Sequence, residues 1–246
     1  MEEEKLVRIE DITEVDAARI AEMSFVHGVR GSVFDRRKQF YEFMRETLYS
    51  EQGLFPYGIC VRPEDVRHAK ECLNANGKHP IKLISVVGFP DGCWYSSQIK
   101  CNEALQAIKD GAQEIDFVMN YEKFKGGDLD YVVREVKSIQ EIAERTRTLT
   151  KMILEATELD DEQIVKACQI ATAAGVDFVG DVTGYFGIAG LNKLKLMREN
   201  FPRGIKLDGR EDEEKNDDFL RLLSGRSDGY IDLNPRLLRV WSNNPY

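Results

Sequence analysis

The sequence is poor in several features that mark particular classes of protein. It has only three histidines among 246 residues, and no stretch approaches the roughly 20 apolar residues of a membrane span. Asp and Glu outnumber Lys and Arg by 43 to 34, which gives a formal net charge of −9. Phosphate backbones are bound by basic clusters, so we expect neither nucleic acid nor a membrane as a partner.

Cysteine is also scarce. The five cysteines are scattered, their number is odd, and no C-x-x-C pair occurs. We therefore expect reduced thiols in a cytoplasmic protein, with no zinc site and no disulfide framework. The acidic start MEEEKLVRIED has no apolar segment of the kind found in a secretory signal. No G-x-G-x-x-G follows the first expected strand, so a dinucleotide-binding fold has little support, and we predict no cofactor.

What the sequence does have is a regular alternation of short apolar runs and amphipathic helical stretches. The eight expected strands are a run near Phe25 and residues 57–61, 81–89, 114–120, 151–157, 177–183, 204–208 and 229–233. Residues 1–50 are mainly helical in pattern, with apolar stripes over 15–23 and 34–49. Strands that alternate with helices indicate parallel βαβ units.

Eight such units and a length near 250 residues are typical of one closed barrel. We predict the α/β class, a (β/α)8 TIM barrel with an extra N-terminal helical segment, as a single domain over residues 1–246. An open doubly wound sheet is the alternative. In barrels of this kind the site lies at the carboxyl ends of the strands, so polar residues late in a strand become the candidates.

Six segments, in order, resemble deoxyribose-phosphate aldolases. They are ICVRPEDV, SVVGFPDG, KCNEALQAIKDGAQEIDFVMN, KMILEATELDDEQI, AGVDFVGDVTGYFGIAG and GIKLDGR. The resemblance covers about residues 57–210. It implies a barrel enzyme that forms a Schiff base between a sixth-strand lysine and an aldehyde.

The resemblance assigns roles to particular positions of this sequence. It places the proton-transferring aspartate at Asp116 and the seventh-strand lysine at Lys206, which are our predicted catalytic residues. The Schiff-base position falls on Gly180, which has no side chain to supply an amine. The family's phosphate-binding turns correspond to Asp208-Gly209-Arg210 and residues 231–233, where Asp208 and Asp232 would repel a phosphate dianion. Deoxyribose 5-phosphate is therefore not the expected substrate.

The remaining candidates each have a structural alternative. Lys206 and Asp116 lie inside apolar runs, where burial perturbs a pKa, but they could also form an ion pair that only orders the barrel. Glu155 ends the fifth strand and could line the mouth. Alternatively, Glu155 and Thr157 could belong to the cap of the next helix, which Thr157 or Asp160 can provide.

Four further positions, Cys60, Gly180, Asp181 and Thr183, are predicted to contact substrate. Cys60 ends the second strand but could act only as a small hydrophobe. Gly180 leaves room for a larger substrate. Asp181 could instead pair with a helix, because strand alternation sends it away from Gly180, and the following loop could bring Thr183 or Tyr185 to the site.

Three functions remain open at this stage. The first is an aldolase-like lyase that acts on a small carbonyl compound, by making or breaking a C–C bond or moving a proton next to the carbonyl. The second is a non-catalytic relative that binds a metabolite or a protein, and assembly into a homo-oligomer is compatible with either. The third is a metal-assisted lyase in which His27 joins the aspartates, although no spacing requires a metal.

Overall fold

A closed barrel of eight parallel strands forms the centre of the molecule. The computed structural model describes residues 6–26, 32–49, 53–75, 77, 80–208, 221–222, 224, 228 and 230–242. The strand order around the barrel is β10-β2-β3-β4-β5-β6-β7-β8. The barrel strands are β2 (Ala21–Phe25), β3 (Gly58–Val61), β4 (Lys82–Val87), β5 (Glu114–Val118), β6 (Leu149–Ile153), β7 (Phe178–Gly180), β8 (Gly204–Asp208) and β10 (Leu238–Ser242).

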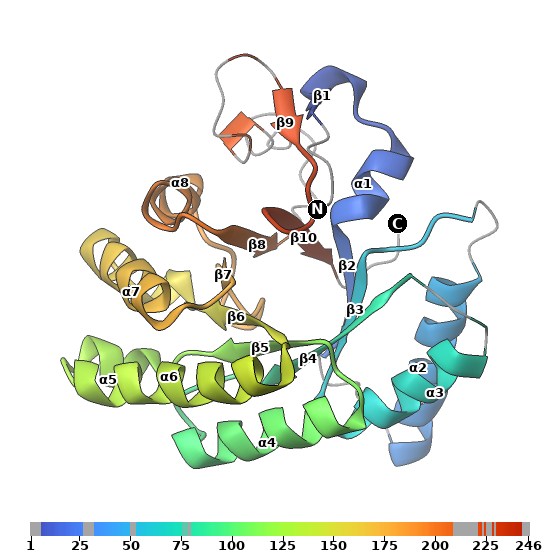
Figure 1. The fold of residues 1–246 in the computed structure, drawn as a ribbon, viewed down its shortest axis with the longest axis horizontal. Helices are drawn as coiled ribbons and strands as arrows, with labels where there is room; N and C mark the ends of the chain where they lie inside the picture. The colour runs from blue at the N-terminus through green and yellow to red at the C-terminus, as the bar shows by residue number, and fades with distance from the viewer. Residues whose placement is uncertain are drawn as a thin grey trace.

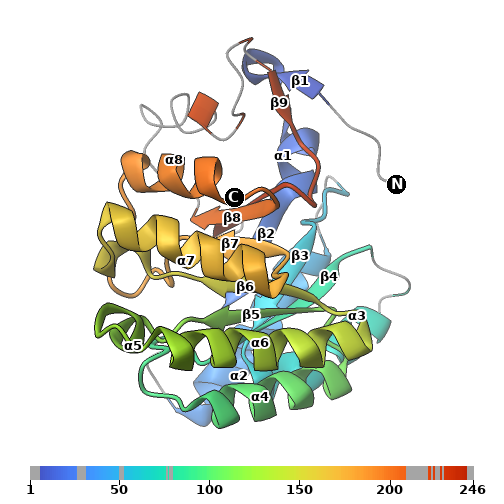
Figure 2. The same cartoon turned by 60° about the vertical axis from the view of Figure 1, so that its left-hand side comes forward.

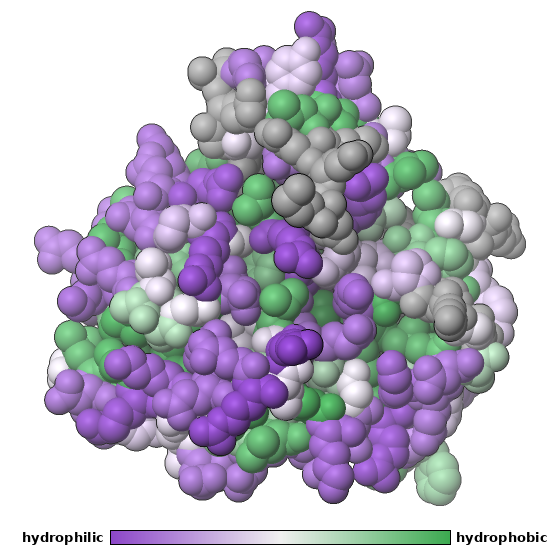
Figure 3. Space-filling model, in the orientation of Figure 1, coloured by the Kyte–Doolittle hydropathy of each residue, from purple (hydrophilic) through white to green (hydrophobic). Residues whose placement is uncertain are grey.

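Helices surround this barrel, as Figure 1 and the turned view in Figure 2 show. The helices are α1 (Glu14–Ile20), α2 (Val33–Leu48), α3 (Val66–Ala75), α4 (Ser97–Asp110), α5 (Tyr121–Lys125), α6 (Leu129–Thr146), α7 (Asp161–Ala174) and α8 (Leu191–Asn200), with 3-10 turns η1 (Ile9–Asp11), η2 (Pro63–Asp65) and η3 (Ala156–Glu158). Most of the core lies between the strands and these helices. Hydrophilic side chains cover the outer helices in the view of Figure 3.

Local sequence explains where several helices begin and end. Ser96 and Asp128 cap the first turns of α4 and α6 through their side chains. Asp160 forms a capping box with Gln163 at the start of α7, and α7 ends at Gly175 in the left-handed conformation. Helix α7 is therefore capped by Asp160, whereas the Thr157 hydroxyl donates to Glu155 Oε1 at 3.0 Å.

The first barrel strand starts earlier than the sequence pattern indicates. The apolar stripe over 15–23 predicts one helix, but α1 ends at Ile20 and β2 begins at Ala21. The strand pairs with β10 on one side and β3 on the other. Alternation within β2 points Glu22 and Ser24 toward the barrel interior, which the helical interpretation concealed.

The eighth barrel strand is a larger correction. The run 229–233 was expected to close the barrel, but β9 (Tyr230–Asp232) pairs antiparallel with β1 (Leu6–Arg8) in a separate two-stranded sheet. The barrel is closed by β10 instead, between β8 and β2. The β1–β9 sheet lies outside the barrel, at the top of Figure 2, and a turn at Asn234 connects it to the start of β10.

Within the described part of the chain, no helix combines the length and the hydropathy needed to cross a bilayer.

Candidate active site

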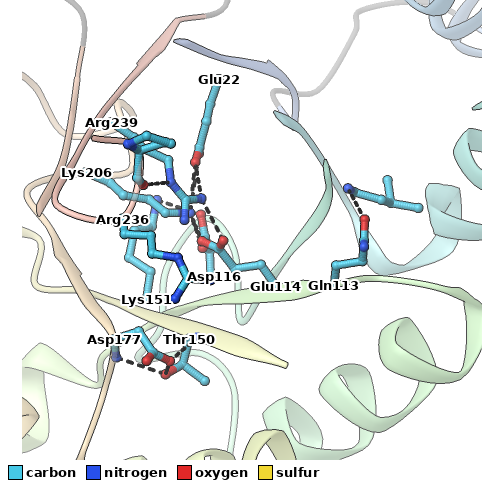
Figure 4. A network of polar contacts seen from close by, with 12 residues as sticks. Glu22, Gln113, Glu114, Asp116, Thr150, Lys151, Asp177, Lys206, Arg236 and Arg239 are labelled. Carbon is cyan, nitrogen blue, oxygen red and sulfur yellow. Dashed lines mark hydrogen bonds and ion pairs between the residues drawn. The ribbon is translucent and has the colours of Figure 1, made fainter. Parts of the chain in front are cut away.

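Six ionisable side chains meet inside the barrel. Three are acids, Glu22, Glu114 and Asp116, and three are bases, Lys151, Lys206 and Arg239. All six side chains are at most 6% exposed. Figure 4 shows them converging from different strands. The formal charges cancel, which is the condition under which burial of so many ions is tolerated.

Lys206 lies in the deep part of this network. Its ammonium is 3.1 Å from Glu22, 3.2 Å from Asp116 and in contact with Glu114, and it also sits over the Phe178 ring. Burial, together with the neighbouring Arg239 guanidinium, lowers the pKa of Lys206 to about 7. This lysine is therefore poised to gain or lose a proton near neutral pH.

Arg239 holds the acids at the base of the network. Its guanidinium donates to Glu22 at 2.7 Å and to Glu114 at 2.6 Å. It also packs between the rings of Tyr57 and Phe178, each 4.3 Å from the guanidinium carbon. Burial by itself raises the pKa of Glu22, but Lys206 and Arg239 lower it to about 2, so this carboxylate stays ionised.

Asp116 joins the network to a second lysine. Its Oδ1 is 3.2 Å from Lys206 Nζ, and its Oδ2 is 2.7 Å from Lys151 Nζ. Burial raises the pKa of Asp116 to about 6, with the Glu22 carboxylate acting in the same direction and Lys151 opposing it. A carboxyl group with this pKa can take up and release protons close to neutral pH.

A small cavity lies above Asp116 and Lys151 at the carboxyl ends of the strands. Its volume is about 30 Å³, room for a water molecule or a group of a few heavy atoms. Its lining consists of Glu22, Ser24, Val26, Cys60, Val86, Phe89, Asp116, Lys151, Ile153, Val182, Thr183 and Trp241. The floor is charged and the walls are mostly apolar, a typical combination in small-molecule sites.

A larger hollow of about 530 Å³ opens at the other end of the barrel. Its lining includes Lys82, Gln113, Arg147 and Arg236, which are near the starts of strands or in the turns before them. Catalytic groups of such barrels gather at the carboxyl ends of the strands. We therefore take the smaller cavity, which contains Asp116 and Lys151, as the candidate active site.

Comparison with known proteins agrees with this architecture. No protein-family model matches the chain. The deoxyribose-phosphate aldolase of Streptococcus pneumoniae is 38% identical over 168 residues, which cover 67% of this chain and 74% of that enzyme. The aldolase of Thermococcus gammatolerans is 40% identical over 144 residues, 58% of this chain.

The chain belongs to the deoxyribose-phosphate aldolase family.

Solved structures support the same fold. The aldolase QR15 superposes with a TM-score of 0.72 at 25% identity, covering 93% of this chain and 92% of its own. The tetrameric deoxyribose-phosphate aldolase of Aeropyrum pernix has a TM-score of 0.70 at 20% identity and covers 94% of this chain and 88% of its own. In the sequence comparison, the region that matches this chain spans only 63% of the length of the Thermococcus gammatolerans aldolase.

The structure brings some predicted site residues of this family member together. Asp116, Cys60 and Thr183 line the cavity. Burial, with the nearby Asp116 carboxylate, raises the pKa of the Cys60 thiol well above its ordinary value, so it presents an uncharged wall. Thr183 is held in place by Glu155, which accepts hydrogen bonds from its amide at 3.1 Å and its hydroxyl at 2.6 Å.

Other predicted residues lie outside the cavity lining. Lys206 is beneath it, and Glu155 acts through Thr183. Asp181 is fully buried, and its Oδ1 accepts the amide of Asp208 at 3.1 Å. Asp208 ends β8 beside that carboxylate.

The structure places Asp232 outside the barrel. It lies in β9, where Leu6 is its strand partner and its side chain accepts the Asn234 amide at 3.1 Å. The expectation that residues 229–233 form the eighth barrel strand is wrong, so the reason for placing Asp232 at the site is lost. His27 lies outside the described residues, and in the described ranges no group of three His, Cys, Asp or Glu side chains could hold a metal ion.

Four members of the network were missed by the sequence analysis. Glu22 fell within an expected helix, and Arg239 lies beyond the last expected strand. Glu114 and Lys151 are charged residues in strands β5 and β6, and Lys151 is the direct strand partner of Asp116. The sequence did contain a signal for both. Glu114 lies two residues before Asp116 and Lys151 lies two residues before the cavity-lining Ile153, so strand alternation points each charged side chain to the barrel interior.

Proposed function

We propose that this protein is an aldolase-type lyase that acts on a small aldehyde or ketone. The observation that carries the proposal is the ion-paired Asp116 and Lys151 at the floor of a mostly apolar cavity. Asp116 is the acid–base group, placed where it can move a proton at a carbon next to the carbonyl. Kinship with deoxyribose-phosphate aldolases supports the reaction class.

The second lysine has a supporting part in this proposal. Lys206 contacts Asp116 from below, and burial together with Arg239 lowers its pKa to about 7. It can therefore share a proton with Asp116 while remaining enclosed. The motif resemblance puts Gly180 at the family's Schiff-base position, so amine catalysis in this chain needs an amine from another position.

We further propose that a sugar phosphate is a poor substrate. Asp208, at the end of β8, is the residue that supports this proposal, whereas Asp232 lies in β9 outside the barrel. A carboxylate at the phosphate end of the site repels a dianion. The small volume of the cavity also suits a short carbonyl compound better than a phosphorylated sugar.

Proton exchange into acetaldehyde in D2O, followed by NMR, tests the reaction class without assuming a substrate for the full reaction. We expect exchange with the wild type and a rate at least about 100-fold lower for Asp116→Asn. The matched control is Asp161→Asn, an exposed residue on α7, which keeps the wild-type rate. Absence of exchange, and of aldol product with a panel of aldehydes and ketones, would contradict the proposal and favour a non-catalytic binding protein.

Cleavage of deoxyribose 5-phosphate and of unphosphorylated deoxyribose tests the substrate. We expect the unphosphorylated sugar to be cleaved at least as fast. A clear preference for the phosphate ester would overturn the substrate part of the proposal while leaving the reaction class intact.

A further inference from the structure

The side chain of Lys151 occupies space that the glycine at position 180 leaves open. A Cβ added to Gly180 would lie 2.9 Å from Lys151 Cδ and 3.2 Å from Lys151 Cε, too close for both to stay where they are. Any larger residue at position 180 would displace this lysine. The extended path of Lys151 along the neighbouring strand therefore depends on the absence of a side chain at Gly180.

This path brings the Lys151 ammonium to the floor of the cavity. Lys151 is the one lysine among the cavity-lining residues of the described chain, and Cys60, Ile153 and Thr183 line the same space. Lys206 is the other lysine on Asp116, but it is completely enclosed and does not reach the cavity. A carbonyl compound that enters the cavity meets the Nζ of Lys151 and not that of Lys206.

We propose that Lys151 is the amine that forms the Schiff base, acting from β6 through the space that Gly180 leaves open on β7. This assignment rests on the proposed lyase function and gives that function the nucleophile that position 180 lacks. The amine comes from the strand next to position 180. It lies at the cavity described above, and Asp116 remains the group that transfers protons.

The contacts of Lys151 supply the proton transfers that the step requires. Burial lowers the pKa of Lys151, but the carboxylates of Asp116 and Glu22 more than offset this, so the resting group is an ammonium. Asp116 takes one proton from it across the 2.7 Å contact. The neutral Nζ then attacks the carbonyl carbon, a C–N bond forms as the C=O π bond breaks, and one proton passes from the attacking nitrogen to the oxygen to give a neutral carbinolamine.

Loss of the hydroxyl completes the step. Asp116 returns its proton to the leaving oxygen, the C–O bond breaks, and water departs as the protonated imine forms. One carbonyl compound and one ammonium thus give one iminium and one water, with no change of oxidation state. The positive iminium remains beside Asp116, which can next remove a proton from the adjacent carbon.

Borohydride trapping with acetaldehyde, followed by peptide mass mapping, tests the assignment. We expect about one ethyl group per chain on Lys151, which blocks trypsin there and yields the peptide 148–166. Modification of Lys206 would instead appear in the peptide 204–210. The Lys151→Met variant should form at least tenfold less trapped adduct than the wild type. The Lys206→Met variant should still form the adduct on Lys151. An adduct that maps to Lys206, or that persists in folded Lys151→Met, would overturn the assignment.

A second variant keeps the test decisive if a lysine substitution prevents folding. Gly180→Ala leaves every lysine in the chain but pushes a methyl group against Lys151, so we expect at least a tenfold slower trapping rate in a protein that still unfolds cooperatively. The control is Gly190→Ala, where an added Cβ meets nothing within 4 Å. Wild-type trapping in Gly180→Ala would contradict the proposal.

The two proposals fail in different ways. Proton exchange and lyase activity without any trapped adduct would refute Lys151 as the amine and leave the lyase function standing. Absence of exchange, lyase activity and adduct would refute the proposed function, and the assignment of Lys151 with it.

Discussion

Individual side chains in the barrel interior have pKa values set by burial and by one another. Asp181 is the simplest case because few charges offset its burial. Burial, together with the Asp208 carboxylate, raises the pKa of Asp181 to about 7. Its Oδ2 has no hydrogen-bond partner in the described part of the chain, which fits a carboxyl group that prefers to be protonated. This residue should therefore make folding stability depend on pH.

Asp181→Asn tests that dependence. In the unfolded chain the carboxyl group has its ordinary pKa near 3.8, so between about pH 4 and 7 the folded state binds more protons. Stability then falls as pH rises through this window, because ionisation favours the unfolded state. We expect urea unfolding midpoints of the wild type to decrease with pH more steeply than those of Asp181→Asn.

The control for this measurement is the exposed Asp161 on α7. Asp161→Asn should keep the wild-type pH profile. An Asp181→Asn profile parallel to that of the wild type would show that this carboxyl group does not carry the dependence.

At the level of elements, a second buried ion pair joins two helices to the end of β5. Lys100 on α4 and Glu135 on α6 are 2.8 Å apart and completely buried. Lys100 also donates to the Val118 carbonyl at 2.8 Å, and Glu135 accepts the Asn120 amide at 3.1 Å. Two charged residues of the segment KCNEALQAIKDGAQEIDFVMN thus have structural roles: Lys100 forms this ion pair, and Glu103 accepts the Gly88 amide at 2.8 Å.

A double-mutant cycle measures how strongly the pair is coupled. Lys100→Met or Glu135→Leu alone leaves one charge buried without its partner, so each should lower the free energy of unfolding by about 3–5 kcal/mol. The double variant should cost clearly less than the sum, since it buries no charge. Denaturant unfolding of the four proteins gives the coupling energy.

The comparison pair for the cycle is Lys123 and Asp128, which are 3.4 Å apart and half exposed. Solvent screening should leave that pair with almost no coupling. Strict additivity of the Lys100 and Glu135 substitutions would mean that the two helices are joined mainly by their apolar contacts.

At the scale of the whole molecule, closure depends on the last described strand. β10 pairs with β8 and β2, and it carries Arg239, the counter-ion of Glu22 and Glu114. Without β10 the barrel would expose two strand edges and leave two buried carboxylates short of a positive charge. The strand therefore contributes both backbone pairing and charge balance.

A chain that ends at residue 237 should consequently not reach the native state. We expect loss of the near-UV circular dichroism signal and binding of a hydrophobic dye, with part of the helical signal retained. Arg239→Leu in the full chain separates the two contributions, because it keeps the strand and removes the charge; its unfolding midpoint should fall while the protein still folds. Cooperative unfolding of the truncated chain would contradict the role of β10 in closure.

Much of the fold was accessible from local sequence patterns. Strand β8 was predicted at its observed bounds, and five other strands were predicted within a few residues, because apolar alternation and helix stops are local signals. The strands at the two ends were misplaced. The stripe of 15–23 fits a helix and a strand about equally well, and the run 229–233 has the composition of a strand whether or not it joins the barrel.

The amino-acid sequence by itself determined the class of fold, the relationship to aldolases and the position of Asp116 within an apolar strand. Only the tertiary structure decided which strand closes the barrel, because pairing between β10 and β2 joins residues more than 200 positions apart. It also decided which lysine reaches the cavity. Lys206 and Lys151 are both lysines in buried strands, and their difference in access arises from the side chains around them, above all from the missing one at Gly180.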